Sequence, residues 1–416
     1  MKNTKPHNGS KTFIKPLRFL KQHQRTGFVT VAGIAAIVLI LLLLFINRPP
    51  IIAFYGIPQN VQNTIINAAI NGQASKKAKF QFQVLNPNKS LASQITPKTK
   101  IALLFVYDGK AAADTVKFAT APDEQVRSLM PSTMRMAGTV NGVAYGLPLL
   151  LDHFELAYNM KKLAQSGINV PMTLEEFKAA AKELKKHTIS PIVCAGAQDA
   201  DLLMLVGALT DAIGGPKAWK SMTDEMKKGK TFSELVRKTP LGSTLQELVE
   251  WRKEGLLHPE WFRMTNKDTI KFMENDYSGF VLMSFSTHRS IPLATIQKFD
   301  SLAFPGAATL KDRSFTAPIL LGILLNPKRV NHPSRDFLYS LAKAEGQKEI
   351  AAQTGLAPVN ATAETLDKQA SDLRFWIAAS DRPVPDPASA SFDSPKLYGD
   401  FAKNVRQYIE ADGSGY

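Results

Sequence analysis

Beyond residue 50, the chain alternates short apolar runs with amphipathic stretches. Ile51–Tyr55 and Ile101–Tyr107 are continuous apolar runs, residues 80–84 alternate apolar and polar side chains, and Asn60 precedes apolar residues at helical spacing. These patterns predict two buried strands, a strand with one covered face, and a helix that Asn60 caps. The order strand, helix, strand, strand favours an α/β sheet.

The same alternation continues in the second half of the chain. Thr173 and Glu176 form a capping-box pattern that opens a helix with one apolar face. Further strands are predicted over residues 190–195, 280–285 and 319–325, and further helices over 201–213, 241–253, 334–344 and 345–353. A second α/β unit therefore follows the first.

Residues 28–46 are apolar all round and long enough to cross a membrane. These nineteen residues contain no charge, and as a helix rising about 1.5 Å per residue they match the thickness of the bilayer hydrocarbon. Seven Lys or Arg residues and no Asp or Glu precede them, which holds the N-terminus in the cytoplasm. We expect a single-pass cell-membrane protein with a cytoplasmic tail over residues 1–27, an anchor over 28–47, and an extracytoplasmic folded region.

A cleaved signal peptide is the alternative interpretation of this segment. We favour an uncleaved anchor because the basic region is long, the apolar stretch exceeds the usual 7–15 residues, and residues 47–50 (Asn-Arg-Pro-Pro) offer no A-x-A-like cleavage site. The single cysteine, Cys194, lies far from the span, so it is neither a lipid-attachment site beside it nor part of an intramolecular disulfide. We expect Cys194 to be a small buried apolar residue.

The composition is that of a globular protein, with 44% hydrophobic and 21% charged residues. The net charge is +15, but seven of those charges belong to the N-terminal tail, and the remaining charge of about +8 is spread without a basic block. Nucleic acid is therefore not an expected partner.

Patterns that carry catalytic or metal chemistry are missing from the sequence. One Cys and seven His residues show no metal-ligand spacing, and GxSxG, Walker-type and GxGxxG motifs do not occur. Asp152 and Glu155 would be the carboxylates for a glycosidase, but many such pairs occur in a chain of this length. We expect no enzyme activity, no cofactor and no metal site.

Several motifs resemble those of the family 1 extracellular solute-binding proteins of ABC importers, which include sugar-binding proteins. The family's Y-x-L-P, its acid four residues past that proline, and its Y-Y-N-K and A-G-x-x-x-P-x-T-W-x-E-F motifs match, in order, residues 145–148, Asp152, residues 157–161, and residues 167–177. Residues 345–350 and 354–360 resemble the family's later S-P-E-G-Q and G-x-x-P-V motifs. The resemblance covers residues 51 to about 410.

The resemblance implies a two-lobed periplasmic-binding-protein fold of type II, an α/β fold that follows one N-terminal transmembrane helix. It places residues 51–151 and 315–358 in the N-terminal lobe, and residues 152–314 and 359–416 in the C-terminal lobe. Ligand would bind in the cleft between lobes that close by hinge motion. The implied partners are a carbohydrate or another small polar solute, and the ABC permease subunits.

Seven candidate ligand-binding residues follow from the resemblance: Tyr55, Phe105, Asp108, Asp152, His288, Arg289 and Phe392. Asp108 occupies a position where the family often has a ligand-binding acid, and Asp152 matches the family's acid at the first crossover. Phe105 and Phe392 fall near positions of stacking aromatics. Other interpretations stay open, because a strand phenylalanine often belongs to the core and an aspartate after a strand often forms a turn.

Departures from the family pattern concern the sugar-stacking residues. Ser286, Thr287, His288 and Arg289 stand where the family often has a Gly-x-Trp segment, and Phe54-Tyr55-Gly56 replaces a tryptophan-rich segment. His288 and Arg289 would suit an anionic or small polar ligand, or form a surface Arg beside a partly buried His. Two functions remain: a tethered import receptor, or a repurposed binding fold with a structural, sensory or protein-interaction role in the cell envelope.

Overall fold

The structure is a computed structural model that describes residues 49–71, 79–96, 99–215, 218–306, 315–316, 318–326, 332–365, 368, 370–372, 383–384, 392 and 394–414. The predicted tail and the predicted span over residues 28–46 lie outside the described residues. In the described part, none of the helices has the length and apolar character needed to cross a membrane. From Pro50 onward the chain belongs to one compact unit.

Six strands of the described chain form the first sheet, in the order β13-β6-β12-β3-β1-β2. Their bounds are β1 Ile51–Tyr55, β2 Gln81–Val84, β3 Ile101–Tyr107, β6 Leu147–Leu151, β12 Ile319–Leu324 and β13 Ala357–Pro358. Strand β1 is parallel to β2 and β3, which confirms the predicted α/β arrangement. Strand β12 inserts antiparallel between β3 and β6, so the sheet is mixed.

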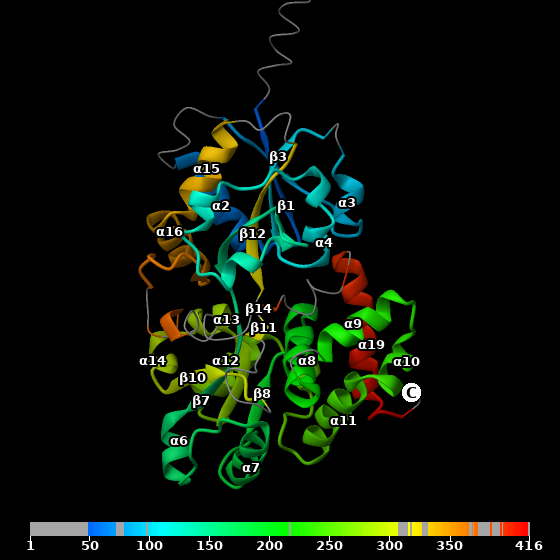
Figure 1. Ribbon diagram of the computed structural model, residues 1–416. Coiled ribbons are helices and arrows are strands. Elements are labelled where there is room, and N and C mark those ends of the chain that lie inside the picture. Colours follow the sequence, from blue (N-terminus) through cyan, green and yellow to red (C-terminus); the bar gives the residue numbers. More distant parts are fainter. Residues whose placement is uncertain are drawn as a thin grey trace, which may run out of the picture. The chain divides into compact units, whose positions relative to one another are not determined.

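Helices and short 3-10 turns accompany the first sheet (Figure 1). They are α2 Gln59–Asn71, α3 Leu91–Gln94, α4 Lys110–Ala113, η2 Val116–Phe118, α5 Glu124–Arg127, η3 Met134–Met136, α15 His332–Ala342 and α16 Ala344–Thr354. Helix α2 begins at Gln59 and not after Asn60, because the first backbone bond of the helix runs from Gln62 to the Pro58 carbonyl. The predicted capping role of Asn60 is therefore wrong.

Four strands form the second sheet, in the order β10-β7-β9-β8. Their bounds are β7 Phe154–Asn159, β8 Ile192–Cys194, β9 Phe280–Ser284 and β10 Phe299–Ala303. Strand β9 ends one residue before the predicted end, because the Ser284 side chain accepts the Thr287 N–H at 3.2 Å and so caps the next helix. Cys194 is 1% exposed in β8, as predicted for a buried apolar residue, and burial raises the pKa of its thiol.

The remaining helices pack around the second sheet or beside it (Figure 1). They are α6 Met160–Gln165, α7 Leu174–Leu184, α8 Asp199–Gly214, α9 Ala218–Lys227, α10 Phe232–Lys238, α11 Pro240–Lys253, η4 Trp261–Arg263, α12 Asn266–Glu274, α13 Phe285–Arg289, α14 Leu293–Ile296 and α19 Pro395–Glu410. The predicted capping box of Thr173 and Glu176 at α7 is confirmed. Phe177 of α7 packs against Trp251 at a ring-centroid distance of 5.6 Å and Phe280 at 5.0 Å, which joins α7, α11 and β9 in one apolar core.

The chain passes directly from the first sheet to the second at Asp152 and His153, between β6 and β7. Two small sheets accompany the main ones: β4 Thr139–Val140 with β5 Val143–Ala144, and β11 Phe315–Thr316 with β14 Pro383–Val384. Strands of the first sheet come from residues 51–151 and 319–358, and those of the second from 154–303. The lobe boundaries at residues 151, 315 and 358 stay a prediction.

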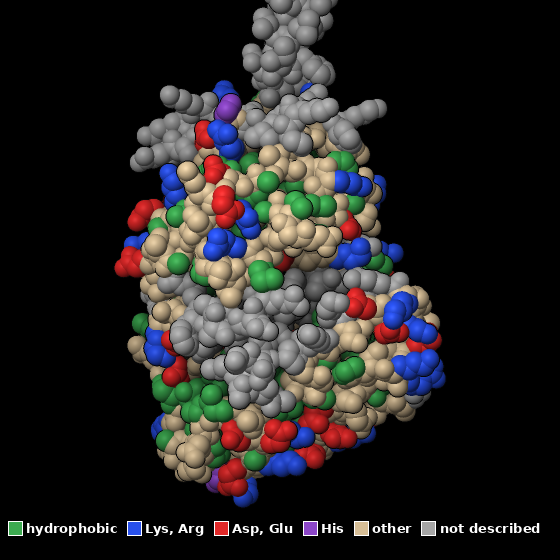
Figure 2. Space-filling view, viewed as in Figure 1, with side chains coloured by type: hydrophobic (Ala, Val, Ile, Leu, Met, Phe, Trp, Pro, Cys, Tyr) green, Lys and Arg blue, Asp and Glu red, His purple; other side chains and the backbone are tan. Residues whose placement is uncertain are grey.

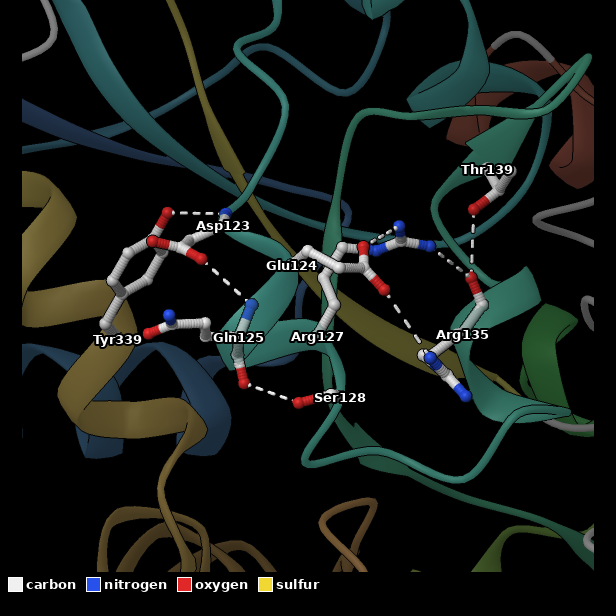
Figure 3. A network of polar contacts seen from close by, with 8 residues as sticks. All are labelled: Asp123, Glu124, Gln125, Arg127, Ser128, Arg135, Thr139 and Tyr339. Carbon is white, nitrogen blue, oxygen red and sulfur yellow. Dashed lines mark hydrogen bonds and ion pairs between the residues drawn. The ribbon is translucent and has the colours of Figure 1, made fainter.

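A polar network stabilises the long connection between β3 and β6 (Figure 3). Glu124 accepts hydrogen bonds from Arg127 at 2.8 Å and Arg135 at 3.5 Å, and the Asp123 N–H donates to the Tyr339 hydroxyl of α15 at 2.8 Å. Arg127 and Arg135 belong to the connection itself, in α5 and η3, so their bonds join two of its parts, while the bond to Tyr339 ties it to α15.

Charges of both signs intermix on the molecular surface around α7, α10 and α11 (Figure 2). Ion pairs such as Lys182 with Glu254 and Lys230 with Glu234 account for part of this mixture. The face shown carries no large patch of one sign, which agrees with the even spread of charge along the sequence.

Candidate functional site

A cavity of about 1040 Å³ lies between residues of the two sheets. Its lining comes from the ends of β1, β3 and β9, and from the first turns of α2, α8, α12 and α19. The crossover at Asp152, helix α13 and the last turn of α16 complete the wall. In α/β sheets ligands bind at the carboxyl ends of strands, and this volume suits a small-molecule ligand. We call this cavity the cleft.

The wall on the side of the first sheet is built by the turn from β1 into α2. Gly56 allows this turn because its φ is +65°, a backbone conformation that disfavours a side chain. Gln62, in the first turns of α2, is 6% exposed and donates from Nε2 to the Ile57 carbonyl at 2.6 Å. Its Oε1 has no hydrogen-bond partner among the described residues, although Gln62 lines the cleft. Gln62 therefore places a buried acceptor without a partner among the described residues in the wall of the cleft.

Asp152 connects the crossover to helix α13 on the opposite wall. Its carboxylate accepts the His153 N–H at 2.8 Å, the Ser286 N–H at 3.0 Å and the Ser286 hydroxyl. Burial raises the pKa of Asp152 to about 6, against the lowering effect of these hydrogen bonds. The nearby charge of Glu155 adds to the increase.

A second acid, Asp201, lines the cleft from the first turn of α8. Asn266, the first residue of α12, donates to the Asp201 carboxylate at 3.0 Å. Burial raises the pKa of Asp201 to about 6, the hydrogen bond from Asn266 opposes this effect, and the charge of Asp152 contributes to it. The charge of Asp152 therefore acts on the Asp201 carboxyl across the cleft wall.

Arg289 lines the cleft and links α13 to the end of α16. Its Nη1 donates to the carbonyls of Gly355 at 3.0 Å and Leu356 at 3.1 Å, and its guanidinium lies 5.3 Å from the Phe285 ring centroid. These partners lie 66 and 67 residues away in the chain, so Arg289 joins the second sheet's helix to the first sheet's helix.

Of the seven predicted binding residues, Asp152 and Arg289 line the cleft. Tyr55 and Phe392 line a smaller pocket of about 50 Å³, where the Tyr55 hydroxyl donates to the Lys89 carbonyl at 2.9 Å. The ligand contacts of all four residues stay predictions.

The other three predicted residues do not line the cleft. Phe105 is fully buried and stacks on Phe54 at 5.7 Å between centroids. Asp108 accepts the Gly138 N–H at 3.3 Å and the Tyr145 hydroxyl at 3.2 Å, and His288 is buried against Glu155. In the structure Phe105 serves packing, while Asp108 and His288 are bonded to other side-chain or backbone groups, and a role in ligand binding stays a prediction for each.

Sequence reasoning missed Gln62, Asp201 and Asn266. An acid in the first turn of a helix commonly complements the helix dipole, so Asp201 carries no distinguishing signal. Gln62 lies on a predicted helix whose buried face is apolar, and only its missing acceptor partner singles it out.

Aromatic side chains are sparse in the described lining of the cleft, where Tyr107 and Tyr398 occur. Trp219, Trp251 and Trp261 are at most 2% exposed and belong to the core around the second sheet. Ser286, Thr287 and Arg289 line the cleft at the place where the family often has a stacking tryptophan. The described lining of the cleft therefore mixes polar groups with apolar residues such as Ile57 and Met204.

A family model for bacterial extracellular solute-binding proteins matches residues 88–375, more than half of the chain. The chain belongs to this family. A comparison with curated protein sequences gives no significant match.

Solved structures support this solute-binding protein's fold. The bacterial solute receptor AcbH, whose description states an exclusive preference for β-D-galactopyranose, has a TM-score of 0.72 and 14% identity, covering 88% of this chain and 93% of its own. A putative binding protein of Bacillus subtilis, in an open conformation, has a TM-score of 0.70 and 14% identity, with coverages of 88% and 93%. A chitin oligosaccharide binding protein has a TM-score of 0.65 and 15% identity, with coverages of 88% and 94%.

At these identities the likeness shows the fold alone. The α/β solute-binding-protein fold expected from the motifs is thereby confirmed for the folded region.

Proposed function

We propose that this protein is an import receptor that captures a carbohydrate in the cleft and passes it to an ABC permease. One observation carries the proposal: a cavity of about 1040 Å³ with carboxylate, amide and hydroxyl side chains in its lining lies between residues of the two sheets of a solute-binding-protein fold. Carboxylates, amides and hydroxyls hydrogen-bond sugar hydroxyls, and Tyr107 and Tyr398 in the lining are aromatic residues of the kind that stack on sugar rings. Similar structures include binding proteins described for galactopyranose, chitin oligosaccharide and maltose.

The geometry of the cleft fits a site that binds a ligand and does not catalyse a reaction. Asp152 is held by Ser286 and His153, and Asp201 by Asn266, so both acids are positioned as hydrogen-bonding groups. Among the described residues, no group of three or more Cys, His, Asp or Glu side chains could hold a metal ion. We propose a receptor and not an enzyme.

Ligand-induced stabilisation tests the binding function. Full-length protein in detergent is expected to gain roughly 3–4 kcal/mol of unfolding free energy when a cognate sugar is present at 100 to 1,000 times its Kd. The measurement is a thermal melt against a panel of mono- and oligosaccharides, with charged sugars included. A flat profile across the panel would contradict the import function and favour a structural or sensory role.

We further propose that residues 28–46 anchor the protein, with the N-terminus in the cytoplasm and the cleft outside. Permanent tethering would raise the receptor's effective concentration at its permease. The expected result is a full-length chain that detergent, but not alkaline carbonate, releases from membranes. Mass-spectrometric detection of a mature chain that begins after Ile46 would instead establish cleavage.

A further inference from the structure

The described lining of the cleft contains two carboxylates and one basic side chain. The carboxylates are those of Asp152 and Asp201, and Gln62 lines the cleft with a buried acceptor oxygen that has no hydrogen-bond partner among the described residues. Among the described residues, Arg289 is the basic side chain in the lining, and it donates to the carbonyls of Gly355 and Leu356.

No cation is among the groups that act on the Asp201 carboxylate in the described structure. Asp199 of the same helix is paired with Arg406 of α19 at 2.7 Å, and Arg406 also donates to the Gly196 and Ala197 carbonyls. The groups that act on the Asp201 carboxyl are its burial, Asn266 and Asp152, and the last of these is a like charge. A cationic group on a ligand would offset the electrostatic cost of two neighbouring buried carboxylates.

Gln62 independently indicates a ligand with hydrogen-bond donors. Its Nε2 is engaged by the Ile57 carbonyl, so the orientation of the amide is fixed, and Oε1 is buried without a hydrogen-bond partner among the described residues. At 6% exposure, water access to this oxygen is limited, and an unsatisfied buried acceptor is costly. A ligand O–H or N–H would satisfy it.

We propose that the cleft selects an amine-bearing sugar, with its ammonium group bound by Asp201 and Asp152 and a hydroxyl or amine donor bound by Gln62 Oε1. An ammonium group supplies three donors and a positive charge, which matches two carboxylates and an amide oxygen. A neutral sugar of the same shape would leave the two carboxylates without a counter-charge. The inference rests on the proposed sugar-binding function and narrows its substrate class.

Paired ligands that differ in one group test the proposal. Glucosamine, galactosamine and a deacetylated chitin disaccharide are compared by calorimetry with glucose, galactose and the N-acetylated disaccharide, using full-length protein in detergent. At pH 7, at least one amine is expected to bind at least tenfold more tightly than its neutral counterpart.

Acidification should weaken this preference. Because the pKa of Asp201 is about 6, its carboxyl is charged at pH 7 and largely protonated at pH 5, whereas a sugar ammonium stays protonated throughout. The ratio of amine affinity to neutral-sugar affinity is therefore expected to fall severalfold between pH 7 and pH 5.

Asp201→Asn is the matched variant because it keeps the shape and removes the charge. It should lose the amine preference at pH 7 and its pH dependence, so that an amine and its neutral counterpart bind with similar affinity. Asp336→Asn, on the exposed face of α15, removes one negative charge away from the cleft and should behave like the unmodified protein. Melting temperatures of both variants establish that they are folded.

The outcomes separate the two proposals. Equal or weaker binding of every amine relative to its neutral counterpart overturns the amine selectivity and leaves the sugar receptor intact. An amine preference that survives in Asp201→Asn also overturns the assignment. Absence of binding by every sugar, charged or neutral, overturns both the selectivity and the receptor function.

Discussion

Replacing His288 with leucine is expected to destabilise the protein by about 3–5 kcal/mol. His288 is fully buried, Glu155 is 1% exposed, and the two side chains bond to each other between α13 and β7. Without the imidazole, the Glu155 carboxyl loses its bonded partner in the interior. Urea unfolding at pH 7 measures the loss.

A double variant distinguishes this cause from poor packing. His288→Leu combined with Glu155→Met replaces the polar pair by apolar side chains of similar size, and buried pairs replaced in this way often cost little. The double variant should recover most of the stability that His288→Leu loses. If it is as unstable as the single variant, the buried carboxyl is not the cause.

Gly346→Ala is expected to cost about 2 kcal/mol or more, although alanine is the better helix former. A Cβ at Gly346 would lie 2.2 Å from the Ser340 carbonyl oxygen and 2.9 Å from the Leu341 Cα. Both atoms are backbone of α15, so α16 must move away as a unit. Since the end of α16 lines the cleft, ligand affinity should fall together with unfolding free energy.

Gly399→Ala is the control for this substitution. Gly399 also lies inside a helix, α19, but its Cβ would meet the Asp199 Oδ2 at 3.2 Å and no backbone atom within 4 Å. This variant should stay within about 1 kcal/mol of the unmodified protein, because the gain in helix propensity offsets a mild contact. Equal losses for both variants would argue against the backbone clash at Gly346.

Two of the family motifs correspond to local interactions that fix the start of a helix. Thr173 and Glu176 cap α7 reciprocally, and Gly346 lets α16 begin against the end of α15. Such positions are predictable because the interactions that fix them lie within a few residues.

The cleft was less predictable than the elements that surround it. Asp152 was found from its place after the Y-x-L-P motif, but its partner Ser286 lies 134 residues away. Phe105 lies in β3 and Asp108 follows it. Phe105 stacks on Phe54, Asp108 accepts hydrogen bonds from Gly138 and Tyr145, and neither residue lines the cleft.

By itself, the sequence determined most strands and helices, the family and the buried state of Cys194, because apolar periodicity and capping are local properties. Tertiary structure alone decided that β12 enters the first sheet antiparallel, and that Gln62, Asp152 and Asp201 line one cleft. Strand periodicity indicates which residues share a face but not what that face meets. Contacts between distant segments depend on how the whole chain packs, and this is why the cleft with its two carboxylates appears only in the folded structure.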